Sequence, residues 1–241
     1  EEVSRGLGDV YKRQILEAFI HAGAANEVKV DVVSIHSEHL TGDNCAQELK
    51  DLHGLLVAPG FGSRGIEGKI SAIKYVRENN IPFFGICLGM QMAVIEYARN
   101  VLGLATANST EMDEDTAHPV ISLMDEQKNV EDKGGTMRLG AWDCALTAGS
   151  RVQDIYKADD ISERHRHRYE LNNAYLTDLT KNGLKATGVN PKTGLAEIVE
   201  IDAHPWFIGV QYHPEYKSTV LEPHPLFSAF VEACNTYANK K

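Results

Sequence analysis

A cysteine enclosed by glycines is the residue of this sequence best suited to covalent chemistry. Cys87 stands between Gly85 and Gly89, directly after an apolar run at residues 81–86 and before a helical pattern at residues 88–99. This order fits the cysteine form of the nucleophile elbow, G-x-C-x-G, whose tight turn leaves no room for β-carbons. A helix N-terminus also lowers the pKa of a thiol and favours the thiolate. The sequence therefore predicts a nucleophile rather than a buried structural cysteine.

A histidine near the C-terminus has the surroundings of a general base. An acyl-transfer thiol needs an imidazole that takes its proton and returns it to the leaving amine, and the imidazole needs an orienting acceptor. His213 follows an apolar run at residues 206–212 and is separated from Glu215 by Pro214. In an extended segment residues i and i+2 project to the same side, so Glu215 is expected to reach the ring while Pro214 fixes the intervening φ. Such a pair more often lies on a surface, but the end of a predicted central strand favours a base.

Glycines also follow the predicted strand at residues 54–58. Gly60 lies in a glycine-rich segment, residues 57–65, where the chain is expected to turn over the elbow. Its backbone N–H and that of Leu88, which follows the nucleophile, are expected to hold the oxyanion of a tetrahedral intermediate. The rival interpretation is a phosphate-cradling loop, and we reject it because the pattern G-x-x-x-x-G-K-[ST] is absent.

Strand and helix patterns alternate along most of the chain. This alternation implies parallel βαβ units and hence an α/β fold: a three-layer α/β/α sandwich with a central, mostly parallel sheet and active residues at the carboxyl ends of its strands. Residues 108–133 are polar, acidic and weakly periodic, which predicts loops and short pieces of structure. The expected helices cover residues 15–20, 66–79, 88–99 and 226–237, and the expected strands cover residues 28–35, 54–58, 81–86, 184–189, 196–201 and 206–212.

Composition is that of a globular domain and narrows the range of partners. The 241 residues are 43% hydrophobic and 24% charged, enough for a full core. A formal charge of −10 offers no basic face to phosphate backbones, so we predict no nucleic-acid partner. No apolar run approaches the roughly 18 residues that cross a bilayer, and no signal peptide is apparent, so we predict no membrane association. The cysteines form no C-x-x-C pair, which predicts neither disulfides nor zinc and favours the cytoplasm.

The first residues fit the predicted fold poorly. Residues 1–13 are polar and broken by glycines, whereas an α/β domain of this type is expected to open with a buried strand. We interpret residues 1–13 as a non-native or disordered leader and residues 14–241 as one domain. This division predicts a sheet without its first strand.

The three glycine- and histidine-containing segments together resemble the class I glutamine amidotransferases, whose signature is a glycine-rich oxyanion loop, a G-x-C-x-G turn and a distal His-Pro-Glu. Over residues 15–239 the chain is also similar to the CTP synthase branch of that family. The resemblance implies a flavodoxin-like fold and a glutaminase that hydrolyses L-glutamine to glutamate and ammonia through Cys87, His213 and Glu215. The segments that carry the second similarity are residues 60–69, 107–111, 134–140 and 163–170.

The same resemblance implies which residues contact glutamine. They are Gly60, Leu88, Gln91, Glu111, Arg168 and Tyr169. Glu111 is implied to accept from the substrate amino group and Arg168 to bind the α-carboxylate, which agrees with an amino-acid substrate's need for one fixed anion and one guanidinium fork. Without the resemblance, residues 164–168 would be a solvated basic turn, and two histidines at i and i+2 without further ligands disfavour a metal site.

Two departures from the family bear on what the resemblance implies. Residues 58–62 read A-P-G-F-G where the family often has P-G-G-F-G, although the glycine whose amide matters is retained. CTP synthases also carry an N-terminal synthetase domain that binds ATP, Mg²⁺ and UTP, and nothing in this chain corresponds to it. We therefore expect no cofactor or metal in this chain, the synthetase domain as its partner, and a homo-oligomer only in the full-length enzyme.

Other functions stay open at this stage. A free-standing γ-glutamyl hydrolase of the same superfamily would use the same triad, and a panel of glutamine and γ-glutamyl amines separates the two. A catalytically silent regulatory module is the second alternative, in particular if a missing strand loosens the sheet; a thermal melt with an activity assay tests it. A binding module without chemistry is least favoured, because only catalysis requires an elbow cysteine together with a strand-end histidine.

Overall fold

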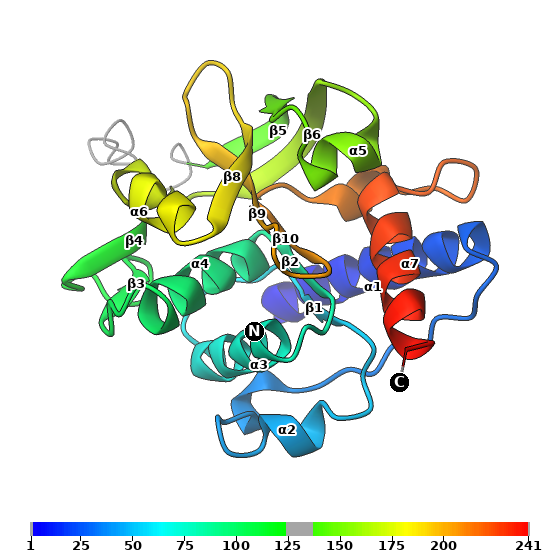
Figure 1. Ribbon diagram of the computed structural model, residues 1–241, viewed down its shortest axis with the longest axis horizontal. Helices are drawn as coiled ribbons and strands as arrows, with labels where there is room; N and C mark the ends of the chain where they lie inside the picture. The colour runs from blue at the N-terminus through cyan, green and yellow to red at the C-terminus, as the bar shows by residue number, and fades with distance from the viewer. Residues whose placement is uncertain (1, 124–136, 241) are drawn as a thin grey trace.

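Helices and strands alternate one by one only over residues 55–109 (Figure 1). The structure, a computed structural model, describes residues 2–123 and 137–240. The helices are α1 (Glu2–Ala25), η1 (Ser37–His39), α2 (Cys45–Glu48), α3 (Ile66–Glu78), α4 (Leu88–Asn100), α5 (Arg151–Tyr156), η4 (Asn173–Tyr175), α6 (Leu176–Lys181), η5 (Pro214–Lys217) and α7 (Pro225–Ala238). The strands are β1 (Leu55–Val57), β2 (Phe83–Ile86), β3 (Ala107–Ser109), β4 (His118–Ser122), β5 (Arg138–Leu146), β6 (Asp160–His167), β7 (Glu170–Leu171), β8 (Leu184–Val189), β9 (Ala196–Ile201) and β10 (Phe207–Val210).

The larger sheet is mixed. Its seven strands lie in the order β1-β2-β10-β9-β8-β5-β6. β2 pairs in parallel with both β1 and β10, and every pair from β10 to β6 is antiparallel. The α/β class is confirmed, but the expectation of a mostly parallel sheet is wrong. A helical crossover, here α3, makes parallel neighbours of β1 and β2, whereas the short connections from β8 to β9 and from β9 to β10 join antiparallel strands.

Helices cover both faces of the sheet, which explains why β2 is apolar without interruption. Phe83 packs in the core formed with α3 and α4, and its neighbour Phe84 packs in the core formed with α1 and α7. Successive strand residues face opposite sides, so a strand buried on both faces loses the apolar–polar alternation. The three-layer arrangement is visible in Figure 1, where α7 lies on one side of the sheet and α3 and α4 on the other. The predicted strands that became β1, β2, β8, β9 and β10 are thereby confirmed.

One predicted strand is wrong. Residues 28–35 join no sheet, and Val33 in their middle is 64% exposed. The segment instead borders a cavity of about 570 Å³ together with α1, β1 and α7. Within the described residues β1 pairs with β2 alone, so it forms an edge of the sheet. β-branched residues favour a strand only where a neighbouring backbone completes the ladder, and residues 28–35 have none.

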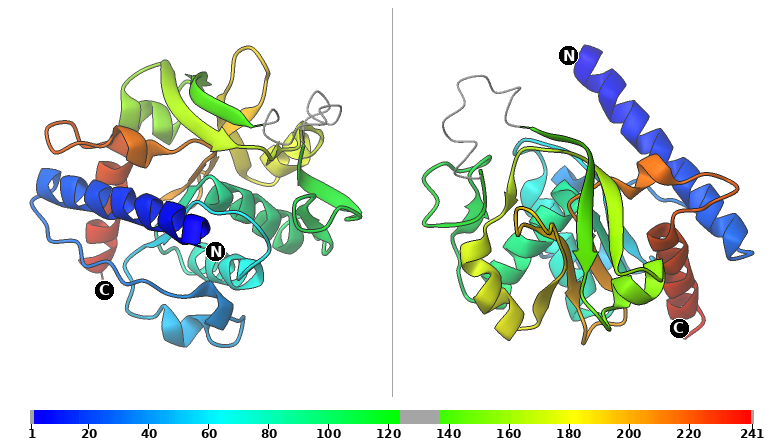
Figure 2. Two further views of the ribbon diagram at one scale, coloured as in Figure 1. Left: turned by 180° about the vertical axis from the view of Figure 1, so that it is seen from behind. Right: turned by 90° about the horizontal axis from the view of Figure 1, so that it is seen from above.

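Another outcome concerns the first residues of the chain. α1 begins at Glu2 and therefore runs through the segment that we interpret as a leader, and its first half projects beyond the sandwich (Figure 2). The origin of residues 1–13 stays a prediction.

None of the helices in the described ranges is long and apolar enough to span a membrane.

The polar middle of the chain supplies two strands of a second, three-stranded sheet, whose order is β3-β4-β7. β3 and β4 are the short pieces of structure expected within residues 108–133, and the remainder of that stretch, from residue 124, lies outside the described residues. The expected family segment at residues 134–140 is described only from residue 137. The chain enters β5 from that point.

Candidate active site

Cys87 occupies a strained turn between β2 and α4. Its φ of 53° and ψ of −103° lie in a region that residues with a side chain rarely adopt. The Cys87 backbone N–H donates to the carbonyl of Val210 at 2.7 Å, and its carbonyl accepts from the N–H of Gln91 at 3.2 Å. The sheet on one side and the first turn of α4 on the other thus hold the thiol at a helix N-terminus.

The glycines on either side of Cys87 are required by close backbone contacts. A β-carbon on Gly85 would lie 2.7 Å from the backbone carbon of Gly89. A β-carbon on Gly89 would lie 2.2 Å from the carbonyl oxygen of Val57, in β1. No flexible side chain relieves either clash, because both contacts are with backbone atoms.

His213 and Glu215 approach Cys87 from the end of β10. The His213 ring lies 2.8 Å, through Nδ1, from Oε1 of Glu215, and the backbone N–H of His213 donates to the carbonyl of Arg164 at 2.8 Å. The ring also stacks on Tyr216, with centroids 4.9 Å apart and planes 6° apart. All three of the expected catalytic side chains are at most 5% exposed. The structure therefore brings Cys87, His213 and Glu215 together in a buried group.

The route by which Glu215 reaches the ring differs from the expectation. An extended His-Pro-Glu segment was the premise of the sequence argument, but Pro214 begins the 3-10 helix η5. The i and i+2 side chains still meet, because His213 precedes the helix with φ −112° and ψ 85°. Pro214 is suited to this position because its fixed φ is that of a first helical residue, where no N–H is needed.

Neighbouring groups favour the charged form of His213. Burial alone would lower its pKa, but hydrogen bonds to Cys87 and Glu215 and the negative charge on both raise the pKa of His213 to about 10. The ring therefore carries a proton at neutral pH, and that proton lies beside the sulfur. A protonated imidazole in contact with a nucleophilic sulfur is the arrangement of cysteine acyl-transfer sites.

The glycine-rich loop after β1 lies against the elbow. A β-carbon on Gly60 would lie 3.1 Å from a methyl group of Leu88, so the two predicted oxyanion residues are neighbours. Leu88 is the first residue of α4, and the first N–H groups of a helix have no partner within the helix. The two residues whose amides are expected at the oxyanion hole are thus close together.

The same loop also carries a second glycine pattern that is typical of phosphate-binding loops. Gly60, Gly62 and Gly65 do follow G-x-G-x-x-G directly before α3, so the pattern by itself admits a phosphate-binding loop. The N–H of Gly62, however, donates to Oε1 of Glu111 at 2.9 Å. A carboxylate bound to the loop repels phosphate. The neighbouring Glu111, and not the glycine pattern, therefore disfavours a phosphate-binding loop.

The remaining predicted substrate residues gather around Tyr169. Gln91, one turn into α4, donates through Nε2 to the Tyr169 carbonyl at 3.0 Å. The Tyr169 side chain is close enough to Glu111 and Arg168 to respond to their charges: burial and Glu111 raise its pKa, and Arg168 lowers it. Glu111 and Arg168 thus both lie near the Tyr169 side chain. Each predicted role in glutamine binding stays a prediction.

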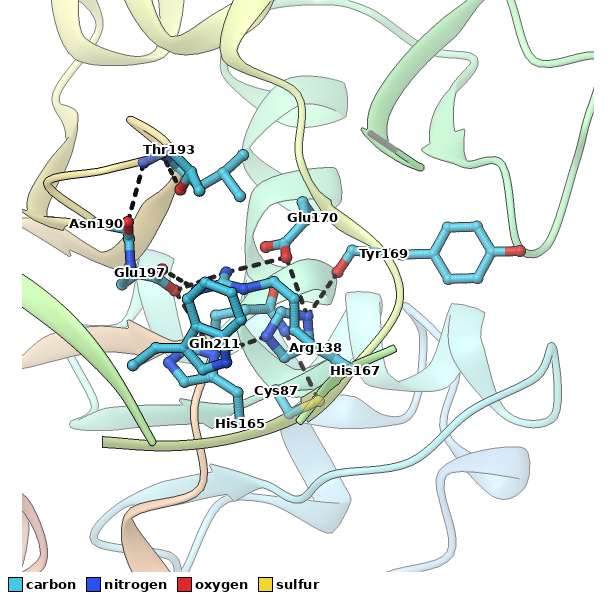
Figure 3. Close-up of polar contacts among 12 residues, drawn as sticks. Cys87, Arg138, His165, His167, Tyr169, Glu170, Asn190, Thr193, Glu197 and Gln211 are labelled. Atoms are coloured by element: carbon cyan, nitrogen blue, oxygen red, sulfur yellow. Dashed lines mark hydrogen bonds and ion pairs between the residues drawn. The ribbon is translucent and has the colours of Figure 1, made fainter. Parts of the chain in front are cut away.

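A buried cluster of charged and polar side chains behind Cys87 was not found from the sequence. It consists of Arg138, His165, His167, Glu170 and Glu197 (Figure 3). Arg138 donates to Glu170 at 3.0 Å and to Glu197 at 2.7 Å, and His165 lies 2.7 Å from His167. The alternation of histidine and arginine in residues 163–168 was the available signal, since in β6 the histidines are buried and the arginines exposed.

Metal binding finds no support in the ranges 2–123 and 137–240, where no three His, Cys, Asp or Glu side chains form a group that fits a metal ion.

Comparison with known proteins identifies the family. The family model described as glutamine amidotransferase class-I matches residues 7–233. This chain belongs to the class I glutamine amidotransferases. Among solved structures, the amidotransferase is similar to the CTPS glutaminase domain of Trypanosoma brucei with bound acivicin, at 40% identity and a TM-score of 0.89, over 95% of this chain and 89% of that one.

Curated relatives carry the name CTP synthase and are longer than this chain. The protein of Flavobacterium johnsoniae is 68% identical over 98% of this chain and 43% of its own length. That of Salinibacter ruber is 56% identical over 97% of this chain and 41% of its own length. The chain thus spans less than half the length of these relatives.

Proposed function

We propose that this amidotransferase hydrolyses L-glutamine and that its ammonia serves CTP formation in a longer protein. The observation that carries the proposal is the buried group of Cys87, His213 and Glu215 at a strained strand–helix turn. The sulfur is the nucleophile, His213 exchanges protons with the reacting atoms, and Glu215 orients the imidazole.

The first half of the reaction forms a thioester. The Cys87 thiolate attacks the side-chain amide carbon of glutamine, and the carbonyl oxygen takes up the electron pair as an oxyanion. The amides of Gly60 and Leu88 stabilise that oxyanion; loss of one such donor typically costs about 100- to 1000-fold in rate. His213 then donates its proton to the amide nitrogen, the carbon–nitrogen bond breaks, and ammonia leaves.

The second half consumes one water molecule. His213, now neutral, takes a proton from water while the oxygen attacks the thioester carbon. The carbon–sulfur bond breaks, glutamate leaves, and sulfur and imidazole regain their starting protonation. Glu111 and Arg168 hold the substrate amino group and α-carboxylate, and Leu88, Gln91 and Tyr169 line the remainder of the glutamine site.

The named relatives support a proposal for the activity of the whole protein. Their name, CTP synthase, and their additional length support a synthetase domain that uses the ammonia with ATP and Mg²⁺ to convert UTP to CTP. This chain supplies the amide-cleaving half only, and it acts in the cytoplasm as part of a homo-oligomeric full-length enzyme. Alone, it is expected to hydrolyse glutamine slowly, because members of the family usually need the synthetase domain to order the site.

The decisive experiment is covalent labelling. A diazo-ketone analogue of glutamine is expected to add one label per chain at Cys87, located by peptide mass spectrometry, and Cys87→Ala is expected to abolish it. The matched control is Cys234→Ala, since burial raises the pKa of the Cys234 thiol to about 12 and keeps it unreactive. Labelling that moves to Cys45 or Cys144 in the Cys87→Ala protein refutes the assignment.

A further inference from the structure

Gln211 lies directly beside the nucleophile, although neither the sequence analysis nor the triad assigns it a role. It follows β10 by one position, its side chain is fully buried, and its backbone N–H donates to the carbonyl of Glu197 at 2.8 Å. Its side-chain Nε2 is 3.7 Å from the Cys87 sulfur, within hydrogen-bond distance for sulfur (Figure 3).

The hydrogen bonds of Gln91 fix which end of the Gln211 amide faces the sulfur. Gln91 Nε2 donates to the carbonyl of Tyr169 at 3.0 Å and to Oε1 of Gln211 at 3.3 Å. An amide nitrogen has two hydrogens and no acceptor capacity, so the Gln211 atom facing Gln91 must be the oxygen. The NH₂ group of Gln211 therefore points at Cys87.

We propose that Gln211 is a further catalytic residue, whose side-chain N–H donates to the Cys87 sulfur and stabilises the thiolate. A hydrogen bond to an ionised acceptor is about twice as strong as one to a neutral acceptor, so the contact favours thiolate over thiol. The inference rests on the proposed function only in taking Cys87 as the nucleophile.

Gln211 and His213 interact with the Cys87 sulfur in different ways during the reaction. His213 gives up its proton when ammonia leaves, and it is then neutral. The amide of Gln211 has no proton to lose, so its donation to the sulfur continues through both halves of the reaction, including the moment when the thiolate is the leaving group of the thioester. The relay through Gln91 links this donor to Tyr169, beside the predicted carboxylate-binding Arg168.

Other titratable side chains near the Gln211 amide form hydrogen bonds or ion pairs with partners other than Gln211. They are His213 at the end of β10, Glu215 on η5, Arg138 on β5, His165 and His167 on β6, Glu170 on β7, and Glu197 on β9. The ion pairs of Arg138 with Glu170 and Glu197, and the contact of His213 with Glu215, do not involve the Gln211 side chain. Replacing that side chain therefore changes the sulfur's surroundings more directly than theirs.

The test measures thiolate reactivity without glutamine. Alkylation of Cys87 by iodoacetamide is followed by mass spectrometry from pH 5 to 10 in the wild-type chain, Gln211→Met and Gln211→Glu. Removal of the donor in Gln211→Met is expected to slow alkylation at pH 7 roughly tenfold and to move the midpoint of the profile to higher pH. Gln211→Glu, which keeps the shape and adds a negative charge next to the sulfur, is expected to have a larger effect in the same direction.

A matched control is Asn190→Leu, which also removes a buried side-chain amide but one that donates to Asp143 and not to the nucleophile. Its alkylation profile is expected to equal that of the wild type. A Gln211→Met protein that melts like Asn190→Leu and alkylates at the wild-type rate overturns the proposal.

A wild-type measurement covers the case in which the Gln211 variants do not fold. The side-chain amide signals of Gln211 in ¹⁵N-labelled protein are expected to shift with pH together with Cys87 ionisation, and to lose that step in Cys87→Ser. Signals that do not respond overturn the proposal. Because no step uses glutamine, a chain in which the diazo-ketone analogue does not label Cys87 but which shows these shifts refutes the proposed function and leaves the hydrogen bond from Gln211 to Cys87 intact.

Discussion

The charge on His213 has consequences for both catalysis and stability. Its folded-state pKa of about 10 lies above the ordinary value of 6.5, so the folded protein binds this proton more tightly than the unfolded chain. The stabilisation is fully present below pH 6.5 and is lost as the pH rises through about 10. Across the intervening range the imidazolium is available to protonate the departing ammonia.

The Glu215 carboxylate is expected to control that charge. Glu215→Gln keeps the shape of the side chain and removes its negative charge, so the pKa of His213 should fall and the ring should lose its orientation. General acid–base catalysis contributes about 10²- to 10⁴-fold, and we expect glutamine hydrolysis to fall within that range. The measurements are an NMR titration of the His213 ring and the rate of ammonia release. Glu222→Gln, on the exposed loop that follows, is the control; an unchanged His213 titration in Glu215→Gln contradicts the assignment.

At the level of elements, the elbow depends on the close packing of β1, β2 and α4. Gly89 in α4 touches the carbonyl of Val57 in β1, and Gly85 in β2 touches the backbone of α4. These contacts fix the position of the Cys87 thiol relative to the sheet. The nucleophile is therefore positioned by backbone-to-backbone contact and not by its own side chain.

Gly89→Ala tests this packing. A β-carbon placed 2.2 Å from a carbonyl oxygen forces α4 away from β1, and overpacking of this kind costs about 1–3 kcal/mol or more. We expect the free energy of unfolding, from urea denaturation, to fall by at least that amount, and labelling of Cys87 to slow. Gly42→Ala is the matched control because no atom lies within 4 Å of the added carbon. Equal stability of the two variants would show that α4 is not held in this way.

Across the whole molecule, the buried cluster joins strands from both sheets. Arg138 on β5 bonds Glu197 on β9 and Glu170 on β7. One guanidinium does not neutralise two buried carboxylates: burial raises the pKa of Glu170 to about 8, with Glu197 acting in the same direction and Arg138 opposing it. Burial likewise keeps His165 neutral, with a pKa lowered to about 3. At neutral pH the Glu170 carboxyl therefore largely keeps its proton inside the cluster, beside a neutral His165.

Arg138→Met is expected to destabilise the protein in a pH-dependent way. Removing one partner of a buried ion pair costs about 3–5 kcal/mol. Glu170 has a folded pKa above its unfolded value, so its contribution to stability falls as the pH rises from 4.5 to about 8. Without Arg138 both carboxyls hold their protons more tightly, and the loss at pH 8 should exceed the loss at pH 6.

Thermal or urea unfolding at both pH values measures this difference. The control is Arg64→Met, whose ion pair with Glu38 is exposed to solvent and is expected to contribute little to stability at either pH. A loss in Arg138→Met that is equal at pH 6 and pH 8 would mean that the carboxylates of the cluster are ionised throughout.

The nucleophile elbow, and the strands and helix next to the catalytic residues in the chain, follow from the sequence. G-x-C-x-G between an apolar run and a helical pattern admits few structures other than an elbow, because local sterics dictate where glycine is needed. The placement of Cys87 at the start of α4, and of His213 after β10, therefore needed no knowledge of the fold. Uninterrupted apolar runs likewise identified β2 and β10, since burial on both faces leaves a clear compositional signal.

The tertiary structure alone decided the features that depend on partners distant in the chain. Residues 28–35 have a strand composition but pair with no strand of the described residues, and His165 of β6 is buried beside Glu197 of β9, which Arg138 of β5 bonds. The donation from Gln211 to Cys87 joins two residues that meet because β10 lies next to β2. A local pattern fixes backbone conformation, whereas strand pairing and the partners of buried charges depend on long-range contacts that composition and periodicity do not encode.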